Sequence, residues 1–120
     1  MSKPIRLLPD GHPENGFVPS SAVSTDDFTT EDRTERISGF YESTDGKVLS
    51  GVWECAPSLE VFDAYPVDEM MTVISGSVKL TSPDGTVQAF SAGDTLFMPK
   101  GTPCTWEITR TLRKFYMIAS

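Results

Sequence analysis

The sequence predicts an all-β protein, an antiparallel barrel preceded by an irregular arm, and three observations support this prediction. From Ile37 onward, short runs rich in Val, Ile, Phe, Tyr and Thr alternate with Gly, Asp and Pro every 8–12 residues or so. No stretch keeps the period of about 3.6 residues that marks an amphipathic helix. The links between runs are too short for parallel crossovers, so we expect antiparallel strands in a closed or sandwiched barrel.

Composition and charge narrow the function classes. A chain of 120 residues suits a single domain with one core and one ligand-sized pocket. The net charge is -7 and no basic cluster exceeds Arg113-Lys114, so binding to nucleic acid or to an anionic membrane is not expected. No apolar run approaches the roughly 20 residues of a membrane helix, and the N-terminus lacks a signal-peptide pattern. Two cysteines then fit reduced thiols, and we expect a cytoplasmic protein.

Residues 1–36 are expected to form the irregular arm, and residues 37–120 the barrel domain. Four prolines before residue 20 interrupt any helix or central strand. The arm could be a partly ordered tail. Alternatively, its isolated apolar side chains could pin it onto the domain or onto a second subunit: Ile5, Leu7, Phe17, Val18 and Phe28.

The barrel region divides into about nine short strands separated by turn signals. Thr44-Asp45-Gly46 and Pro83-Asp84-Gly85 have the composition of tight turns. Gly76 is expected to end a strand that begins at Glu69. The expected strands are residues 40–43, 47–55, 59–65, 69–74, 77–81, 87–90, 95–98, 105–108 and 112–118.

Two stretches resemble the paired motifs of the cupin superfamily. Glu69 and Gly76 match the end of the first motif, E-x6-G. Gly93, Pro99 and Gly101 match the start of the second motif, G-x5-P-x-G. The resemblance covers about residues 37–120 and implies a double-stranded β-helix, or jelly-roll, barrel. Cupins are often homodimers, so it also implies a homodimer.

Within the superfamily, the chain resembles one branch of single-domain cupins. That branch is similar to the cupin domain of (S)-ureidoglycine aminohydrolase and to ethanolamine-utilisation cupins. The residues that carry this likeness are Gly51-Val-Trp-Glu-Cys55, Tyr65-Pro-Val-Asp-Glu69, Thr105-Trp-Glu107 and Arg113-Lys-Phe-Tyr116.

The histidine ligands of the cupin metal site are missing. The first-motif positions fall on Asp63 and Tyr65, or on Phe62 and Ala64 with the longer spacing, and the second-motif position falls on Cys104. Glu69 alone matches a ligand, and the single histidine of the chain, His12, lies in the arm. No cofactor is therefore predicted. An oxygen-based site for a divalent metal is kept as a lesser alternative, with ligands among Asp63, Asp68, Glu69 and Glu107.

Three candidate residues occupy the family's ligand positions. Glu69 should face the barrel interior with Met71 and Val73, either as a general acid/base and ligand anchor or as a structural carboxylate paired with a cation. Tyr65 can donate a hydrogen bond to a ligand or only pack a corner. Cys104 fits a small apolar pocket wall better than a nucleophile, because no histidine stands near it in sequence to act as a base.

Four more candidates lie on the strands. Trp53 and Trp106 could form the flat walls of a pocket or simply fill the core. Lys114 and Tyr116 share a strand face with Leu112, and the sequence leaves open whether that face is interior. If it is, Lys114 would pair with Glu69 or hold an anionic ligand.

The leading functional hypothesis is a small-molecule-binding cupin without the usual metal site. Its ligand would be a carbonyl- or nitrogen-containing metabolite held among these seven residues. Two alternatives stay open: a metabolic enzyme of ureidoglycine-aminohydrolase or isomerase type with Glu69 as acid/base, and a non-catalytic accessory or scaffold subunit.

Overall fold

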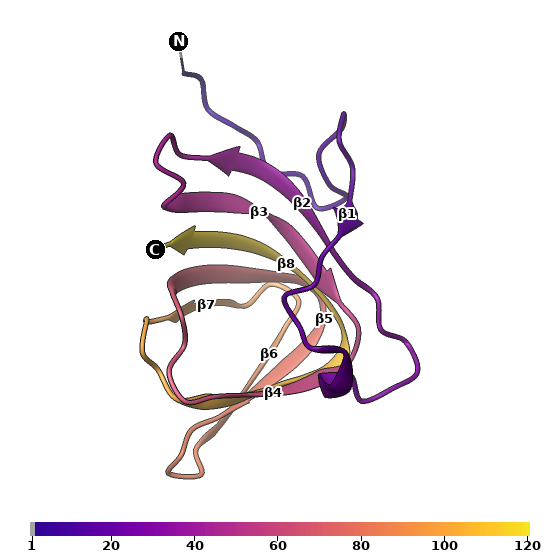
Figure 1. Ribbon diagram of the computed structural model, residues 1–120, viewed down its shortest axis with the longest axis vertical. Coiled ribbons are helices and arrows are strands. Elements are labelled where there is room, and N and C mark those ends of the chain that lie inside the picture. Colours follow the sequence, from indigo (N-terminus) through magenta and orange to yellow (C-terminus); the bar gives the residue numbers. More distant parts are fainter. Residues whose placement is uncertain (1) are drawn as a thin grey trace.

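The computed structural model describes residues 2–120 as an antiparallel sheet that curls into a cupin-type barrel, with the arm laid against it (Figure 1). The all-β prediction is confirmed. The sheet order is β1-β2-β3-β8-β5-β6, with β4 paired to β8 and β7 paired to β5. The strands are β1 Val18–Pro19, β2 Glu35–Glu42, β3 Val48–Cys55, β4 Ser58–Phe62, β5 Asp68–Thr81, β6 Val87–Ser91, β7 Thr95–Met98 and β8 Cys104–Ala119, and one 3-10 turn, η1, spans Thr25–Asp27.

Two long strands, β5 and β8, replace four of the expected short ones. Gly76 does not end its strand, because β5 runs on for 14 residues. Register shifts between Val73 and Val78 bend β5, so its two halves serve different walls of the barrel. The 16-residue β8 likewise pairs with β3 along one half and with β4 along the other.

The interior face of both long strands follows the expected alternation. Glu69, Met71 and Val73 are buried, whereas the neighbouring Asp68 and Met70 are exposed. On the C-terminal half of β8, Leu112, Lys114 and Tyr116 are buried, so the face that the sequence left open is interior. The core therefore contains an ammonium group and a carboxylate as well as apolar side chains.

The arm packs along the domain in two sections. Residues 9–17 cross the outer face of the sheet, where the Phe17 ring lies 4.4 Å from the Arg36 guanidinium and 5.0 Å from that of Arg113. Strand β1 then pairs with β2, and Val23 enters the core with 6% of its surface exposed. β2 begins at Glu35, just before the expected domain boundary. No helix within residues 2–120 is long and apolar enough to cross a membrane.

Candidate functional site

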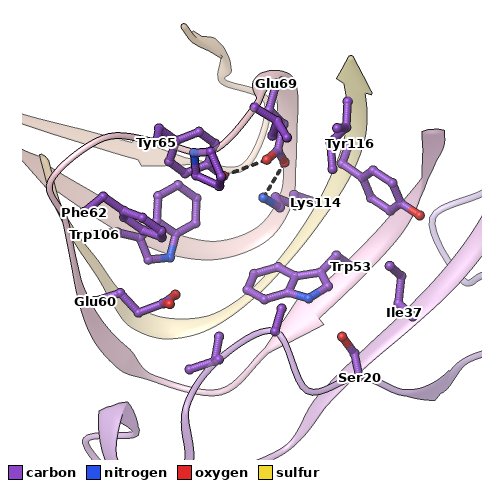
Figure 2. Close-up of a pocket in the computed structure, with 15 residues that line it drawn as sticks. Ser20, Ile37, Trp53, Glu60, Phe62, Tyr65, Glu69, Trp106, Lys114 and Tyr116 are labelled. Atoms are coloured by element: carbon purple, nitrogen blue, oxygen red, sulfur yellow. Dashed lines mark hydrogen bonds and ion pairs between the residues drawn. The ribbon is translucent and has the colours of Figure 1, made fainter. Parts of the chain in front are cut away.

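A cavity of about 350 Å³ opens inside the barrel, between β3, β4, β5, β8 and the arm. Figure 2 shows its aromatic walls and the ionic groups that face it. Six of the seven predicted site residues line it: Trp53, Tyr65, Glu69, Trp106, Lys114 and Tyr116. Strand alternation explains five of these positions, which are inward-facing and buried on β3, β5 and β8. Tyr65 lies in the loop between β4 and β5, where its backbone N–H donates to the Thr102 carbonyl and its carbonyl accepts from the Gly101 N–H.

Cys104 is the predicted site residue that does not reach the cavity. It is buried at the first residue of β8, where its register partner is Phe62 of β4, and its short side chain does not line the pocket. Burial raises the pKa of its thiol, and burial raises that of Cys55 to about 12. Both cysteines are free, as expected, and their environments favour unreactive thiols.

Glu69 connects two hydrogen-bond donors at one end of the cavity. The Tyr65 hydroxyl donates to Glu69 Oε1 at 2.6 Å, and Lys114 Nζ donates to Glu69 Oε2 at 2.7 Å (Figure 2). Only 3% of Glu69 and 5% of Lys114 are exposed. Of the alternatives for Lys114, the structure realises the ion pair with Glu69, which makes a buried ammonium tolerable.

The Lys114 ammonium lies among soft and aromatic groups. Nζ is 4.8 Å from the ring centre of Trp53 and 4.9 Å from that of Trp106, both within cation–π range. It also approaches Met71 Sδ at 3.1 Å. A lysine ammonium has three N–H groups, so one donor remains after Glu69 and Met71, with the two indole rings and the cavity around it.

Burial keeps the pocket phenols protonated. Burial raises the pKa of Tyr65, and the negative charge of Glu69 raises it further. The pKa of Tyr116 is raised for the same two reasons in the same order. Both side chains are therefore hydrogen-bond donors rather than bases across the physiological pH range.

The residues at the cupin ligand positions do not fit a metal ion. Both Glu69 oxygens already accept hydrogen bonds, and one of the donors is itself a cation, Lys114. Tyr65 is held protonated, Asp63 is exposed, and Cys104 has a raised thiol pKa. The ammonium thus occupies the place where a metal's positive charge would be needed.

The carboxylates of the alternative, oxygen-based metal site do not come together either. Asp68 is exposed and accepts a hydrogen bond from the Lys100 backbone N–H at 2.7 Å. Glu107 faces outward from β8 and forms an ion pair with Lys79 at 3.2 Å. Within residues 2–120, no three His, Cys, Asp or Glu side chains cluster as metal ligands would.

Glu60 is a pocket residue that the sequence pattern did not reveal. On β4 the apolar Leu59 and Val61 point outward, with exposures of 41% and 71%, whereas Glu60 and Phe62 line the cavity. Burial raises the pKa of Glu60 to about 7, and the charges of Asp27 and Glu35 add to the shift. The period-two alternation of this strand could have revealed Glu60. However, hydrophobicity alone would turn Leu59 and Val61 inward and Glu60 outward, which is the reverse of what the structure has.

Glu35 is a second carboxylate that the sequence did not single out. It accepts hydrogen bonds from Ser20 Oγ at 2.5 Å, Ala22 N at 3.0 Å, Val23 N at 2.9 Å and Trp53 Nε1 at 3.0 Å. Burial alone would raise its pKa, but these hydrogen bonds together outweigh burial and lower it. Glu35 thus joins the arm to one indole wall of the pocket, which makes Ser20, Ala22 and Val23 part of the lining.

The barrel and its interior pocket define a cupin, and comparison with known proteins specifies the family. Residues 42–116 match the EutQ-like cupin domain, and the chain belongs to that family. None of the curated proteins matches it significantly. The closer likeness to ureidoglycine aminohydrolase stays a prediction.

Solved structures of similar fold include proteins of unknown function. One, a DUF861-family protein from Pseudomonas syringae pv. tomato str. DC3000, is 27% identical with a TM-score of 0.81, over 94% of this chain and 46% of that one. The chain therefore spans a little under half of that protein. The putative ethanolamine utilization protein EutQ of Salmonella typhimurium LT2 is 20% identical (TM-score 0.60; 74% and 72% covered). EutQ of Clostridium difficile is 19% identical (TM-score 0.59; 82% and 80% covered), and both likenesses concern the fold alone.

Proposed function

We propose that this protein is a small-molecule-binding cupin whose ligand occupies the barrel cavity and needs no histidine metal site. The observation that carries the proposal is the Lys114 ammonium, which lies between two indole rings in a cavity of about 350 Å³. That volume lies at the small end of ligand pockets. Aromatic walls with a few converging polar groups suit a small planar metabolite that contains a carbonyl or a nitrogen.

The residues that line the cavity would have different roles in ligand binding. Lys114 has an N–H that can donate to a carbonyl oxygen of the ligand, because Glu69 and Met71 engage the other two. Glu69 would act as a positioning residue, since both of its oxygens already accept hydrogen bonds. Trp53 and Trp106 would stack on the planar part of the ligand.

Tryptophan fluorescence offers a direct test, because Trp53 and Trp106 are the two tryptophans of the chain and both line the cavity. Benzamide and uracil serve as planar carbonyl probes. We expect saturable changes in emission together with a higher unfolding temperature. Lys114→Met should weaken binding, whereas the outward-facing Lys79→Met should not. If neither probe, nor any planar carbonyl or nitrogen heterocycle in a wider panel, alters emission or unfolding, the proposal fails.

The enzyme alternative has one observation in its favour, the hydrogen-bonded chain Tyr65–Glu69–Lys114 beside the cavity. Glu69→Gln should then abolish turnover of a candidate substrate while its binding persists. The scaffold alternative is a subunit whose pocket is vestigial. A filled barrel would favour it, and the cavity of about 350 Å³ withholds that support. We further propose that the protein is cytoplasmic and forms a homodimer. A solution mass of twice 13.2 kDa would support the homodimer, and a mass of 13.2 kDa would contradict it.

A further inference from the structure

The charges around the cavity do not balance. Lys114 is neutralised by Glu69 at 2.7 Å, and Glu35 is fully engaged by four hydrogen bonds. Glu60 also lines the cavity, and its carboxyl group makes no hydrogen bond or ion pair with another side chain or backbone group of residues 2–120. Its oxygens are reached by solvent, since no fully buried side-chain oxygen in this range lacks a partner. Asp27 lies close enough to repel it further. The pocket therefore contains one carboxyl group that has no ion-pair partner among residues 2–120, and the distant Lys114 only partly offsets its charge.

Aromatic side chains surround this carboxyl group. Glu60 on β4 is the direct cross-strand partner of Trp106 on β8, and Phe62 follows it on the same face. Figure 2 shows the Glu60 carboxyl directed into the cavity below Trp106 and beside Trp53. A cation gains both from a carboxylate and from the faces of aromatic rings, which carry negative partial charge.

The acidic groups around Glu60 disfavour the binding of anionic and of neutral ligands. An anionic ligand near Glu60 would meet three acidic groups, Glu60, Asp27 and Glu35, and the one ammonium of the pocket is already paired. A neutral ligand without a donor would leave the carboxyl without a partner, and a neutral donor would supply a hydrogen bond but no counter-charge for the ionised carboxylate. A positively charged nitrogen resolves both problems.

We propose that the pocket selects ligands that carry a protonated amine, and that Glu60 is the specificity-determining residue that binds the ammonium group against Trp106 and Phe62. This inference rests on the proposed function and adds the charge class of the ligand. Lys114, at the other polar end of the cavity, contacts the acceptor part of the same molecule. The ligand class is thus a small amine with a flat or apolar body and a hydrogen-bond acceptor.

The titration behaviour of Glu60 agrees with this assignment. Its pKa of about 7 reflects burial first, then Asp27 of η1 and Glu35 of β2, against a smaller opposing effect of Lys114 on β8. A bound ammonium would favour the ionised carboxylate. Affinity for an amine should therefore increase as the pH rises through about 7.

Benzylamine and benzyl alcohol test the inference, because they share ring and size and differ in charge. Titrations followed by tryptophan emission should show benzylamine binding about tenfold more tightly or better, a difference of about 1.4 kcal/mol. Benzoate, the anionic counterpart, should bind most weakly. Glu60→Gln should bring benzylamine and benzyl alcohol to similar affinity. Glu107→Gln, on the outer face of β8, should keep the wild-type preference.

Each outcome decides between the two proposals. If benzyl alcohol or benzoate binds as well as benzylamine to the wild-type protein, the inference is wrong and ligand binding in the cavity stands. If none of the three probes changes the emission while benzamide or uracil does, the inference is overturned and the proposed function stands. If benzamide, uracil and the wider panel fail as well, both are overturned. The wild-type comparison needs no variant, so it stays decisive even if Glu60→Gln folds poorly.

Discussion

At the scale of single residues, the buried ion pair is the most constrained feature of the barrel. Removing an ammonium from water costs several kcal/mol, and only a partner in good geometry offsets this cost. Lys114 has Glu69 at 2.7 Å and two indole rings within 5 Å. The pair therefore has to be treated as a unit, because either charge alone would be a strong defect in the core.

Glu69→Gln is expected to lower the free energy of unfolding by about 3–5 kcal/mol, because it leaves Lys114 charged, buried and without a counter-ion. Tyr65→Phe, which removes only a neutral donor to the same carboxylate, should cost about 1–2 kcal/mol. The double variant Glu69→Gln/Lys114→Met should recover much of the loss. Urea unfolding measures all three. Wild-type stability in Glu69→Gln would show that the pair is unimportant.

The raised pKa of Glu60 makes the protein less stable as the pH rises, whereas a salt-bridged acid, with a lowered pKa, makes a protein more stable as the pH rises. Its pKa is about 7 in the fold and 4.5 ordinarily, so folding favours the protonated carboxyl. This contribution is fully present below about pH 4.5 and is lost as the pH rises through about 7. Glu60→Gln, which mimics the protonated form, should gain stability over wild type as the pH rises from about 5 to about 8. The gain should be about 1–2 kcal/mol, less than the full shift implies, because the half-exposed carboxyl is screened by water. An unchanging difference across that range would contradict the assignment.

Sequence alone located some of these residues and missed others for definite reasons. Strand alternation predicted that Glu69 faces the interior. For Lys114 it predicted only a face shared with Leu112 and Tyr116, because which face is interior, and whether Lys114 pairs with Glu69, depends on which strands become neighbours. Glu60 was not predicted as a pocket residue because the more hydrophobic face of β4 points outward. Glu35 was not predicted as a site residue because its partners are backbone N–H groups of the arm and the Trp53 indole. No short sequence motif indicates such contacts.

At the scale of elements, Gly76 explains how β5 can serve two walls of the barrel. Its φ is +82°, and a Cβ built on it would lie 2.0 Å from the Thr111 carbonyl oxygen of β8. Glycine is thus required for two reasons, the left-handed backbone and the close approach of β8. A sequence reading treats such a glycine as a stop, because the bend and the end of a strand have the same local composition.

Gly76→Ala and Gly85→Ala separate these two requirements. Gly85 has a similar φ of +90°, and a Cβ there would meet nothing within 4 Å. Gly85→Ala should therefore cost only the left-handed strain, about 1–2 kcal/mol. Gly76→Ala should cost clearly more, or fail to fold, because backbone atoms of β5 and β8 must move apart. Thermal unfolding of the two variants compares them, and equal losses would refute the close-approach explanation.

At the scale of the whole molecule, the arm belongs to the functional unit. Its first section covers the outer face of the sheet through Phe17, and its second section closes the cavity through Ser20, Ala22 and Val23. The Glu35 carboxylate holds the second section in place and orients Trp53 at the same time. We therefore expect access of a ligand to the pocket to depend on the position of residues 20–23.

Val23→Asp tests this coupling, and Val18→Asp is its matched control on the same arm. Val23 is 6% exposed and belongs to the core, whereas Val18 is 52% exposed. A carboxylate at position 23 would lose about 2 kcal/mol of apolar burial and would lie beside the acidic Glu35. The segment should detach and expose Trp53, which shifts the emission to longer wavelength and increases quenching by acrylamide. Val18→Asp should leave both readouts unchanged. Wild-type emission and quenching in a folded Val23→Asp variant would mean that the arm does not control access to the cavity.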